Sequence, residues 1–403
     1  MDILVGILGL MIATMITLML AIRRPALTRI LWIALLLRIT AALIHAFVAP
    51  LPDGTSDAVG YELQAWEWGQ NGFSPALGYF GEKGYSWYYA NVAALVYSVF
   101  GRSPLLLQSF SVLAGVLAVF WSWKLASEIW GDQAVARRAA LLTALFPTLV
   151  MYSALTMREA FIVLLLVMAF FYVVRWANTG KLSFAFLALA LLFMQVFLHG
   201  GIAVAGVLFL VIVVVYSMRQ FIRRLRVRAL NVKSFMVIVG ALMIIIILGR
   251  QLLSIGLPYL GSVDSLFDSG MYIVRAFEIG GADYPLWLLP KSALDQFLVA
   301  PIRAVYFLFA PFPWDITKAS YLFGLFDGLI YLFLAYYMFK NRKTIWQNRS
   351  TRVLFLILCC LVIVYAFGTN NFGTGLRHRA KFVVLMIALS APMIPRRSFR
   401  LRM

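Results

Sequence analysis

PLPDGTSDAVGYELQAWEWGQNGFSPALGYFGEKGYSWY, residues 50–88, is a polar interval between two long apolar runs. The chain carries only 16 acidic residues against a formal charge of +19. Several of those acids fall within this interval: Asp53, Asp57, Glu62, Glu67 and Glu82. Because the flanking runs reach the roughly 20 apolar residues that a helix needs to cross a bilayer, we expect the interval to be a loop at a membrane surface. If the protein is an enzyme, we expect its first catalytic residues in this loop.

The composition excludes a soluble globular protein. Of the 403 residues, 63% are hydrophobic and 13% are charged. Backbone polar groups in hydrocarbon must be satisfied within the segment, so the apolar runs are expected to be helices. Lys and Arg residues fall in short loops between the runs, which is the positive-inside pattern and not the footprint of a nucleic-acid-binding surface. The sequence predicts an all-α polytopic membrane protein that contacts membrane lipids and no nucleic acid.

The positions of the apolar runs predict about eleven transmembrane helices in a single domain, residues 1–403. The predicted spans lie at 1–21, 30–48, 105–126, 139–153, 160–174, 182–198, 202–218, 235–248, 321–339, 353–367 and 382–393. Basic loops place the N-terminus outside and the C-terminus in the cytoplasm, with large outer loops at about 50–104 and 250–319. This charge asymmetry and the short loops favour a bacterial inner membrane.

Two shorter apolar segments are predicted to lie at the membrane boundary. Residues 88–100 are too few to span, so we expect an interfacial helix within the first outer loop. Its aromatic residues are expected at headgroup level: Trp87, Tyr88, Tyr89 and Tyr97. Residues 307–313, interrupted by Pro311, are expected to be re-entrant or interfacial. Arg38, inside the second predicted span, is expected to be buried against another helix or to snorkel.

The pattern Asp57, Tyr61, Ala65 follows the second predicted span and supplies the first candidate site. A carboxylate at this place could act as a general base on an acceptor hydroxyl or could bind a cation. It could equally be a solvated loop acid. Asp53 and Glu62 compete with Asp57 for the catalytic role.

Two cationic segments are expected to reach the same outer face. Arg158 and Glu159 occupy a tight turn between spans, where they could pair with each other or grip a phosphate. Arg377, His378, Arg379 and Lys381 cluster at a helix start, a favourable place for an anion, although they could instead pair with acids of the second outer loop. His199 lies at a Gly-Gly turn; we count it among the substrate-binding candidates and interpret it first as structural. The histidines and the adjacent Cys359 and Cys360 lack metal-ligand spacing, so no metal site or cofactor is predicted.

Together these motifs resemble the GT-C membrane glycosyltransferases, which include protein mannosyltransferases and bacterial aminoarabinose and polysaccharide-type transferases. The likeness covers about residues 30–220 and 368–395 and depends on motif order. The motifs are Asp57…Tyr61…Ala65, Val99-Phe-Gly-Arg-Ser103, Ala144-Leu-Phe-Pro147…Tyr152-Ser153…Arg158-Glu159, and Gly375-Leu-Arg377-His-Arg379-Ala-Lys381-Phe382. The chain departs from the family in its additional first span and in lacking Asp-x-Asp in the first loop.

The resemblance implies a glycosyltransferase of cell-envelope polysaccharide biosynthesis that takes its sugar from a polyprenyl-phosphate donor. By this resemblance Asp57 is the catalytic base and Glu159 matches the acid of the second outer turn. Arg158, Arg377, Arg379 and Lys381 would hold the donor phosphate, with Tyr61 and His199 beside the substrate. The acceptor would be a hydroxyl of a glycan, lipid or protein. Three alternatives stay open: a polymerase of lipid-linked repeats, a flippase or transporter for such glycans, and a scaffold in an export complex.

Overall fold

The computed structural model describes residues 2–84, 87–226, 239–240, 243, 282–288, 290, 293–319 and 321–395. Apart from one isolated bridge between Asp283 and Asn371, these residues form helices and turns without a strand. Within them, seven helical stretches are long and apolar enough to cross a membrane: Asp2–Arg23, Pro25–Phe47, Pro104–Trp130, Glu159–Thr179, Gly200–Gln220, Tyr321–Lys340 and Arg349–Gly368. The chain is thus an all-α membrane protein.

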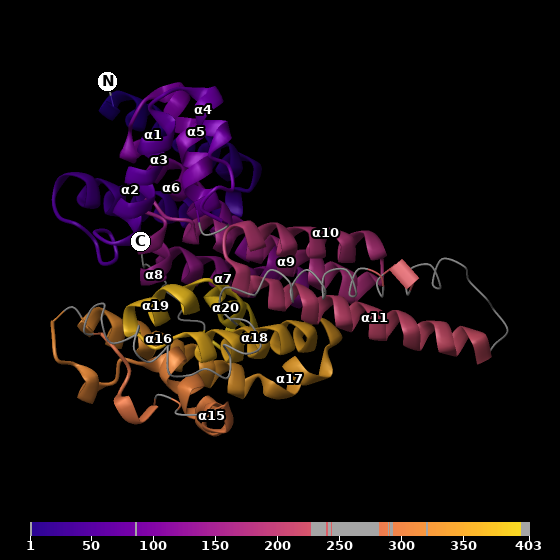
Figure 1. Cartoon of the computed structure of the whole chain (residues 1–403). Helices are drawn as coiled ribbons and strands as arrows, with labels where there is room; N and C mark the ends of the chain where they lie inside the picture. The colour runs from indigo at the N-terminus through magenta and orange to yellow at the C-terminus, as the bar shows by residue number, and fades with distance from the viewer. Residues whose placement is uncertain are drawn as a thin grey trace, which may run out of the picture.

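The N-terminal half is built around α6 (Pro104–Trp130). This helix packs against α1 (Asp2–Arg23), α2 (Thr28–Phe47), α7 (Gln133–Leu145) and α9 (Glu159–Thr179). The outward faces of α1 and α2 expose apolar side chains such as Leu4 and Leu36, as expected for helices that face lipid. In Figure 1, α1, α2 and α6 lie in the upper block, in indigo to purple, and α7 and α9 lie below it.

The C-terminal half packs beneath it around α18 (Arg349–Gly368). Four helices of this half pack against it: α15 (Ala293–Phe309), α17 (Arg342–Gln347), α19 (Phe372–Ala380) and α20 (Val383–Ser390). Helix α16 (Tyr321–Lys340) packs against α15 and α20. Helices α9, α10 (Leu182–Met194) and α11 (Ala203–Arg226) lie between the halves, and α11 extends past the other helices (Figure 1). One large buried apolar cluster joins α6, α9, α11, α18 and α20.

The structure divides the span predicted at 139–153 into α7 and α8 (Pro147–Tyr152). Pro147 has no N–H to donate, and the residue before a proline avoids helical geometry; Phe146 accordingly has ψ 118°. The interruption leaves carbonyls at the end of α7 without helical partners. The buried guanidinium of Arg38 donates to two of them, Ala144 O at 3.1 Å and Thr143 O at 3.4 Å. Arg38 is therefore buried against another helix, one of the two arrangements expected for it.

Two other predicted spans differ from expectation. Residues 182–198 form α10 and a short 3-10 turn, Gln195–Phe197, and 382–393 contain only the eight-residue α20. The prediction at 235–248 falls outside the described residues apart from 239–240 and 243, as does most of the outer loop expected at 250–298. Near 307–313, α15 ends at Phe309 and a cis Ala310–Pro311 bond follows.

Residues 57–100 fold into a helical layer at one end of the bundle. It comprises α3 (Asp57–Gly69), α4 (Phe73–Gly78) and α5 (Tyr88–Phe100). The helix predicted at 88–100 is thus present. Tyr89 and Tyr97 are buried within this layer, because Tyr89 packs edge-on against Tyr61 and the Tyr97 hydroxyl donates to Glu62 at 3.0 Å.

Candidate functional site

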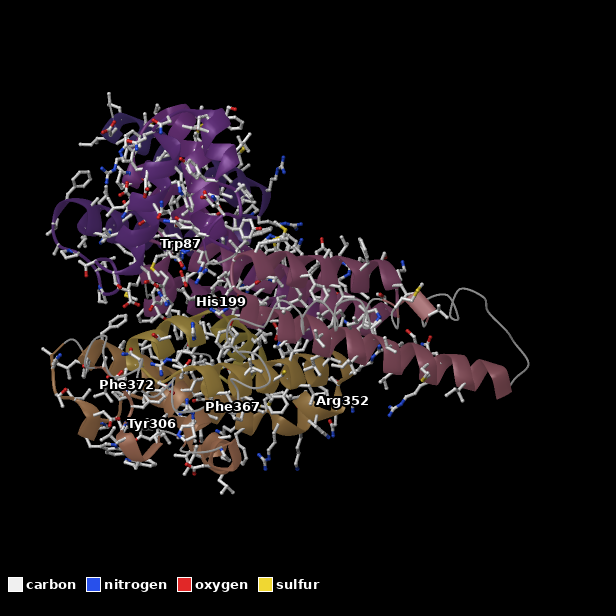
Figure 2. The ribbon with its side chains drawn as sticks, in the orientation of Figure 1. Trp87, His199, Tyr306, Arg352, Phe367 and Phe372 are labelled. Carbon is white, nitrogen blue, oxygen red and sulfur yellow. The ribbon has the colours of Figure 1, made fainter. Side chains whose placement is uncertain are left out.

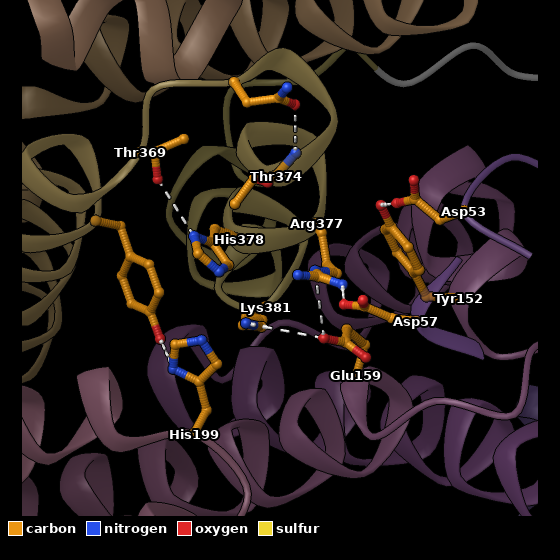
Figure 3. Close-up of polar contacts among 12 residues, drawn as sticks. Asp53, Asp57, Tyr152, Glu159, His199, Thr369, Thr374, Arg377, His378 and Lys381 are labelled. Carbon is orange, nitrogen blue, oxygen red and sulfur yellow. Dashed lines mark hydrogen bonds and ion pairs between the residues drawn. The ribbon is translucent and has the colours of Figure 1, made fainter. Parts of the chain in front are cut away.

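Three segments far apart in the sequence bring their charged residues together. Asp57 is the first residue of α3, Glu159 is the first residue of α9, and Arg377 lies on α19. Arg377 donates through Nη1 to Asp57 Oδ2, and its Nε lies 3.8 Å from Glu159 Oε1 (Figure 3). Each carboxylate is at a helix N-terminus, where the helix dipole favours negative charge. The convergence predicted for Asp57, Glu159 and Arg377 is therefore present.

Lys381 joins the same group because of helix geometry. It follows Arg377 by four residues and keeps helical backbone angles, so both side chains project from one face of α19. Its Nζ lies 3.9 Å from Glu159 Oε1. Neither Lys381 Nζ nor Glu159 Oε2 has a hydrogen-bond partner, although both side chains are buried. The ammonium can donate a hydrogen bond to a bound polar group or water, and the carboxylate oxygen can accept one.

Arg379, predicted to hold the donor phosphate, lies outside this group. Its side chain is fully buried and pairs with Asp327 of α16, with Nη2 2.8 Å from Oδ2. Its remaining donors reach backbone carbonyls of Phe307, Leu308, Ala310 and Gly324. Two residues along a helix turn a side chain about 200° from Arg377. Arg379 therefore fastens α19 to α15 and α16.

Glu62 is no longer a rival of Asp57. Arg102 binds its carboxylate with both Nε, at 2.9 Å, and Nη2, at 2.8 Å. Tyr97 donates to the same carboxylate. Glu62 accepts these three hydrogen bonds and so connects α3 to the end of α5. Its role is therefore structural, and we do not assign it to a substrate.

Asp53, the other rival, stays at the edge of the cluster. Its Oδ2 accepts a 2.7 Å hydrogen bond from the hydroxyl of Tyr152 (Figure 3). Burial raises the pKa of the Asp53 carboxyl above its usual value, while the Tyr152 bond and the charge of Arg377 oppose that change. Its φ of 59° lies in the left-handed region, which Asp tolerates better than most residues. Asp53 therefore forms the side of the site next to Asp57.

Arg158 and Tyr61 pack together on the other side. The Arg158 guanidinium carbon lies 5.4 Å from the centre of the Tyr61 ring, within cation–π distance. Burial raises the pKa of the Tyr61 hydroxyl to about 12, against the lowering effect of Arg158. The phenol is therefore protonated at neutral pH and available as a hydrogen-bond donor.

His199 lies in the inner wall of the site. The hydroxyl of Tyr365 is 3.0 Å from His199 Nδ1, and the His199 ring meets the His378 ring edge-on at 5.1 Å. His378 Nδ1 is 3.2 Å from the Thr369 hydroxyl (Figure 3). Burial first, and the charge of Lys381 second, lower the pKa of both imidazoles well below the usual value. Two neutral histidines thus separate the cations from the apolar interior.

Tyr152, Tyr365 and Thr369 contribute to the site without having been predicted. Tyr152 appears in the quoted motif, but nothing in its spacing indicates that it meets Asp53. Tyr365 and Thr369 lie at the end of an apolar run, where a hydroxyl usually signals only a helix terminus. The spacing of Arg377 and Lys381, in contrast, already places them on one helix face and apart from Arg379.

Another buried arginine holds α19 in place. Arg303 of α15 donates to carbonyls at the end of α18, including Ala366 O at 3.2 Å and Thr369 O at 3.0 Å. The isolated bridge between Asp283 and Asn371 fixes the next residues, and the Asn371 side chain caps α19 by accepting from Gly373 N and Thr374 N. The cations of α19 are therefore positioned by a rigid connection.

Exposure is graded across the site. The side chain of Asp57 is 43% exposed and that of Arg377 is 18% exposed, whereas Glu159 and Lys381 are 2% and 1% exposed. A molecule arriving from water meets Asp57 first, and the buried cations lie behind it. Among the described residues, no group of three or more His, Cys, Asp or Glu side chains is placed to hold a metal ion.

Such an arrangement can accept a proton at its open end and stabilise an anion within. Comparison with known proteins gives no further guidance: no protein-family profile, no curated protein and no solved structure matches this chain.

Proposed function

We propose that this chain is an inverting glycosyltransferase that takes a sugar from a polyprenyl-phosphate donor and transfers it to an acceptor hydroxyl at the outer face of the membrane. The observation that carries the proposal is the meeting of Asp57, Glu159, Arg377 and Lys381 from three separate segments. A partly exposed carboxylate in front of buried cations suits a reaction that needs a base and a place for a leaving phosphate.

In the proposed reaction the acceptor oxygen attacks the anomeric carbon of the donor sugar. The bond from that carbon to the phosphate oxygen breaks, and the polyprenyl phosphate leaves with the electron pair. Asp57 takes the hydroxyl proton of the acceptor, since it is the most exposed carboxylate of the cluster. Removal of a positioned general base costs about 10²–10⁴ in rate.

Arg377, Lys381 and Arg158 stabilise the departing phosphate, because charge that develops in a water-poor site is stabilised strongly by preorganised cations. Lys381 Nζ, which lacks a hydrogen-bond partner, is the donor best placed to gain one from the phosphate. Glu159 keeps Arg377 and Lys381 in position through its Oε1. The acceptor is a glycan, lipid or protein of the cell envelope, and a polymerase of lipid-linked repeats would use the same chemistry.

A flippase has less support. Arg38 and Asp327 are the charged residues near the middle of predicted spans, and both make structural contacts. A transport path would need such groups to line it.

The test uses purified protein in liposomes with a panel of polyprenyl-phosphate sugars, and it measures release of polyprenyl phosphate. Asp57→Asn should lower turnover by about 10²–10⁴ and leave donor binding nearly unchanged. The matched control is Glu67→Gln, which alters an exposed carboxylate on the same helix. Near-normal turnover by Asp57→Asn, with Glu67→Gln equally active, would remove Asp57 from the proposed role.

A further inference from the structure

A pocket lies between α11 and α18, two of the helices long enough to span a membrane. It has a volume of about 380 Å³ and is lined by Trp176, Val211, Ile212, Val215, Tyr216, Arg219, Gln220, Arg349, Arg352, Val353 and Leu356. Arg219 lies near the end of the apolar stretch Gly200–Gln220, and Arg349 begins the stretch Arg349–Gly368. The pocket therefore opens at the level of a membrane boundary.

The same two helices carry the candidate site at their other ends. His199 precedes α11 and lies 20 residues before Arg219, and Tyr365 lies near the end of α18, 16 residues after Arg349. At 1.5 Å per residue this separation is about 24–30 Å. Figure 2 shows Arg352 on one side of the molecule, well away from His199 and Phe367. The pocket is thus a separate feature on the opposite membrane face.

The polar end of the pocket is strongly cationic. Three of its lining residues are arginines and none is acidic. The Arg349 guanidinium stacks on Tyr216 at 3.5 Å and on Trp176 at 4.6 Å, and its buried Nη2 has no hydrogen-bond partner. Arginine held by aromatic rings keeps its N–H groups in a fixed fork that matches a phosphate.

The other end of the pocket is apolar and open to the surroundings. Val211 and Val215 of α11 are 42% and 43% exposed, and Leu356 of α18 is 39% exposed. These side chains lie one to two helix turns toward the membrane interior from the arginines on the same helices. A ligand that fills the pocket needs an anionic head and a hydrocarbon tail.

We infer that this pocket binds an anionic phospholipid of the membrane leaflet opposite the candidate active site. The phosphate lies against Arg219, Arg349 and Arg352, and an acyl chain follows Val211, Val215 and Leu356. Basic pockets between membrane helices recognise anionic headgroups in this way. A zwitterionic lipid would bring its own ammonium group close to the arginines, so net negative charge is preferred.

The inference is tested by lipid binding to the purified full-length protein, with no need for an enzymatic assay. The probes are nanodiscs or micelles containing phosphatidylglycerol, with phosphatidylcholine for comparison. Each basic residue near an anionic surface contributes about 1 kcal/mol. Arg349→Gln/Arg352→Gln should therefore weaken phosphatidylglycerol binding on the order of thirty-fold and leave phosphatidylcholine binding unchanged.

The matched control is Arg342→Gln/Lys343→Gln, which removes two charges from the neighbouring helix α17 outside this pocket. The control should bind phosphatidylglycerol as the wild type does. An equal loss in the control would show general surface attraction and overturn the assignment. Unchanged binding by the pocket variant would overturn it too, as would displacement of the lipid by inorganic phosphate at equal concentration.

Arg219→Gln provides a milder variant if the double substitution does not fold. Arg219 is exposed on α11, and its removal should weaken phosphatidylglycerol binding about five-fold. Wild-type affinity for phosphatidylglycerol in a folded Arg219→Gln variant would count against the assignment.

Discussion

Arg377 and Arg379 are two residues apart in one short helix, and their surroundings differ completely. Arg377 is partly exposed among the carboxylates of the candidate site, whereas Arg379 is buried against Asp327. Removing one partner of a buried pair leaves an uncompensated charge and costs about 3–5 kcal/mol. Replacement of Arg379 should therefore affect folding, whereas replacement of Arg377 should affect turnover.

Arg379→Met should prevent accumulation of monodisperse protein, because Asp327 would stay buried without a cation. Asp327→Asn/Arg379→Met should recover part of the yield. Arg377→Met should fold and elute normally while losing donor turnover. Size-exclusion chromatography of detergent-solubilised protein measures the first two effects. A well-folded, inactive Arg379→Met protein would contradict the structural role of that arginine.

Asp53 offers a test based on pH. Burial raises the pKa of its carboxyl above the usual 3.8, so the folded state binds the proton more tightly than the unfolded state. Stability contributed by that proton is complete below about pH 3.8 and is lost as pH rises through the higher folded value. Asp53→Asn keeps an acceptor for Tyr152 and cannot ionise.

Between about pH 4 and 7, the midpoint temperature of thermal unfolding should therefore fall with rising pH more steeply in the wild type than in Asp53→Asn. Glu67→Gln, altered at an exposed acid, should keep the wild-type slope. Parallel curves for the wild type and Asp53→Asn would show that Asp53 contributes nothing to the pH dependence.

At the scale of elements, one ion pair connects α3 to the end of α5. Glu62 is buried and receives two hydrogen bonds from Arg102 and one from Tyr97. Arg102→Ala should destabilise the protein by about 1–3 kcal/mol, in the lower half of that range because Arg102 is 40% exposed.

A double-mutant cycle measures this coupling. Glu62→Gln/Arg102→Ala should cost less than the sum of the single changes, since the second change removes the charge left unpaired by the first. Unfolding in mixed micelles with increasing denaturing detergent provides the free energies. Additive single effects would show that the pair does not hold α3 to α5.

The long helices were predictable from the sequence, because the thickness of a bilayer sets the number of apolar residues that a spanning helix needs. The long apolar runs became α1, α2, α6, α9, α11, α16 and α18 because a span of about 20 residues has no other way to satisfy its backbone. The interruption between α7 and α8 was not predictable in the same way. Helix α7 ends where Pro147 removes a backbone donor, and the donor that replaces it is Arg38 of α2, about a hundred residues earlier in the chain. Charge type alone likewise could not separate Arg377 from Arg379, although their positions on one helix could.

At the scale of the whole molecule, the predicted orientation can be tested with two cysteines. Both native cysteines, Cys359 and Cys360, are replaced by Ala, and a single cysteine is introduced at Glu82 or Lys343. Both positions are exposed, one between α4 and α5 in the first predicted outer loop and one in α17. A membrane-impermeant maleimide should label Glu82→Cys in intact cells and Lys343→Cys only after permeabilisation. The reverse pattern would place the candidate site in the cytoplasm.

Arg38 has a consequence for biogenesis. It lies at the middle of α2, where an unaccompanied arginine raises the cost of membrane insertion by about 2.5–3.5 kcal/mol. The carbonyls that satisfy it, at Thr143 and Ala144, are synthesised about a hundred residues later. Arg38 therefore gains its hydrogen bonds to another helix only after α7 has been synthesised, and pairing of α2 with α7 recovers part of that cost.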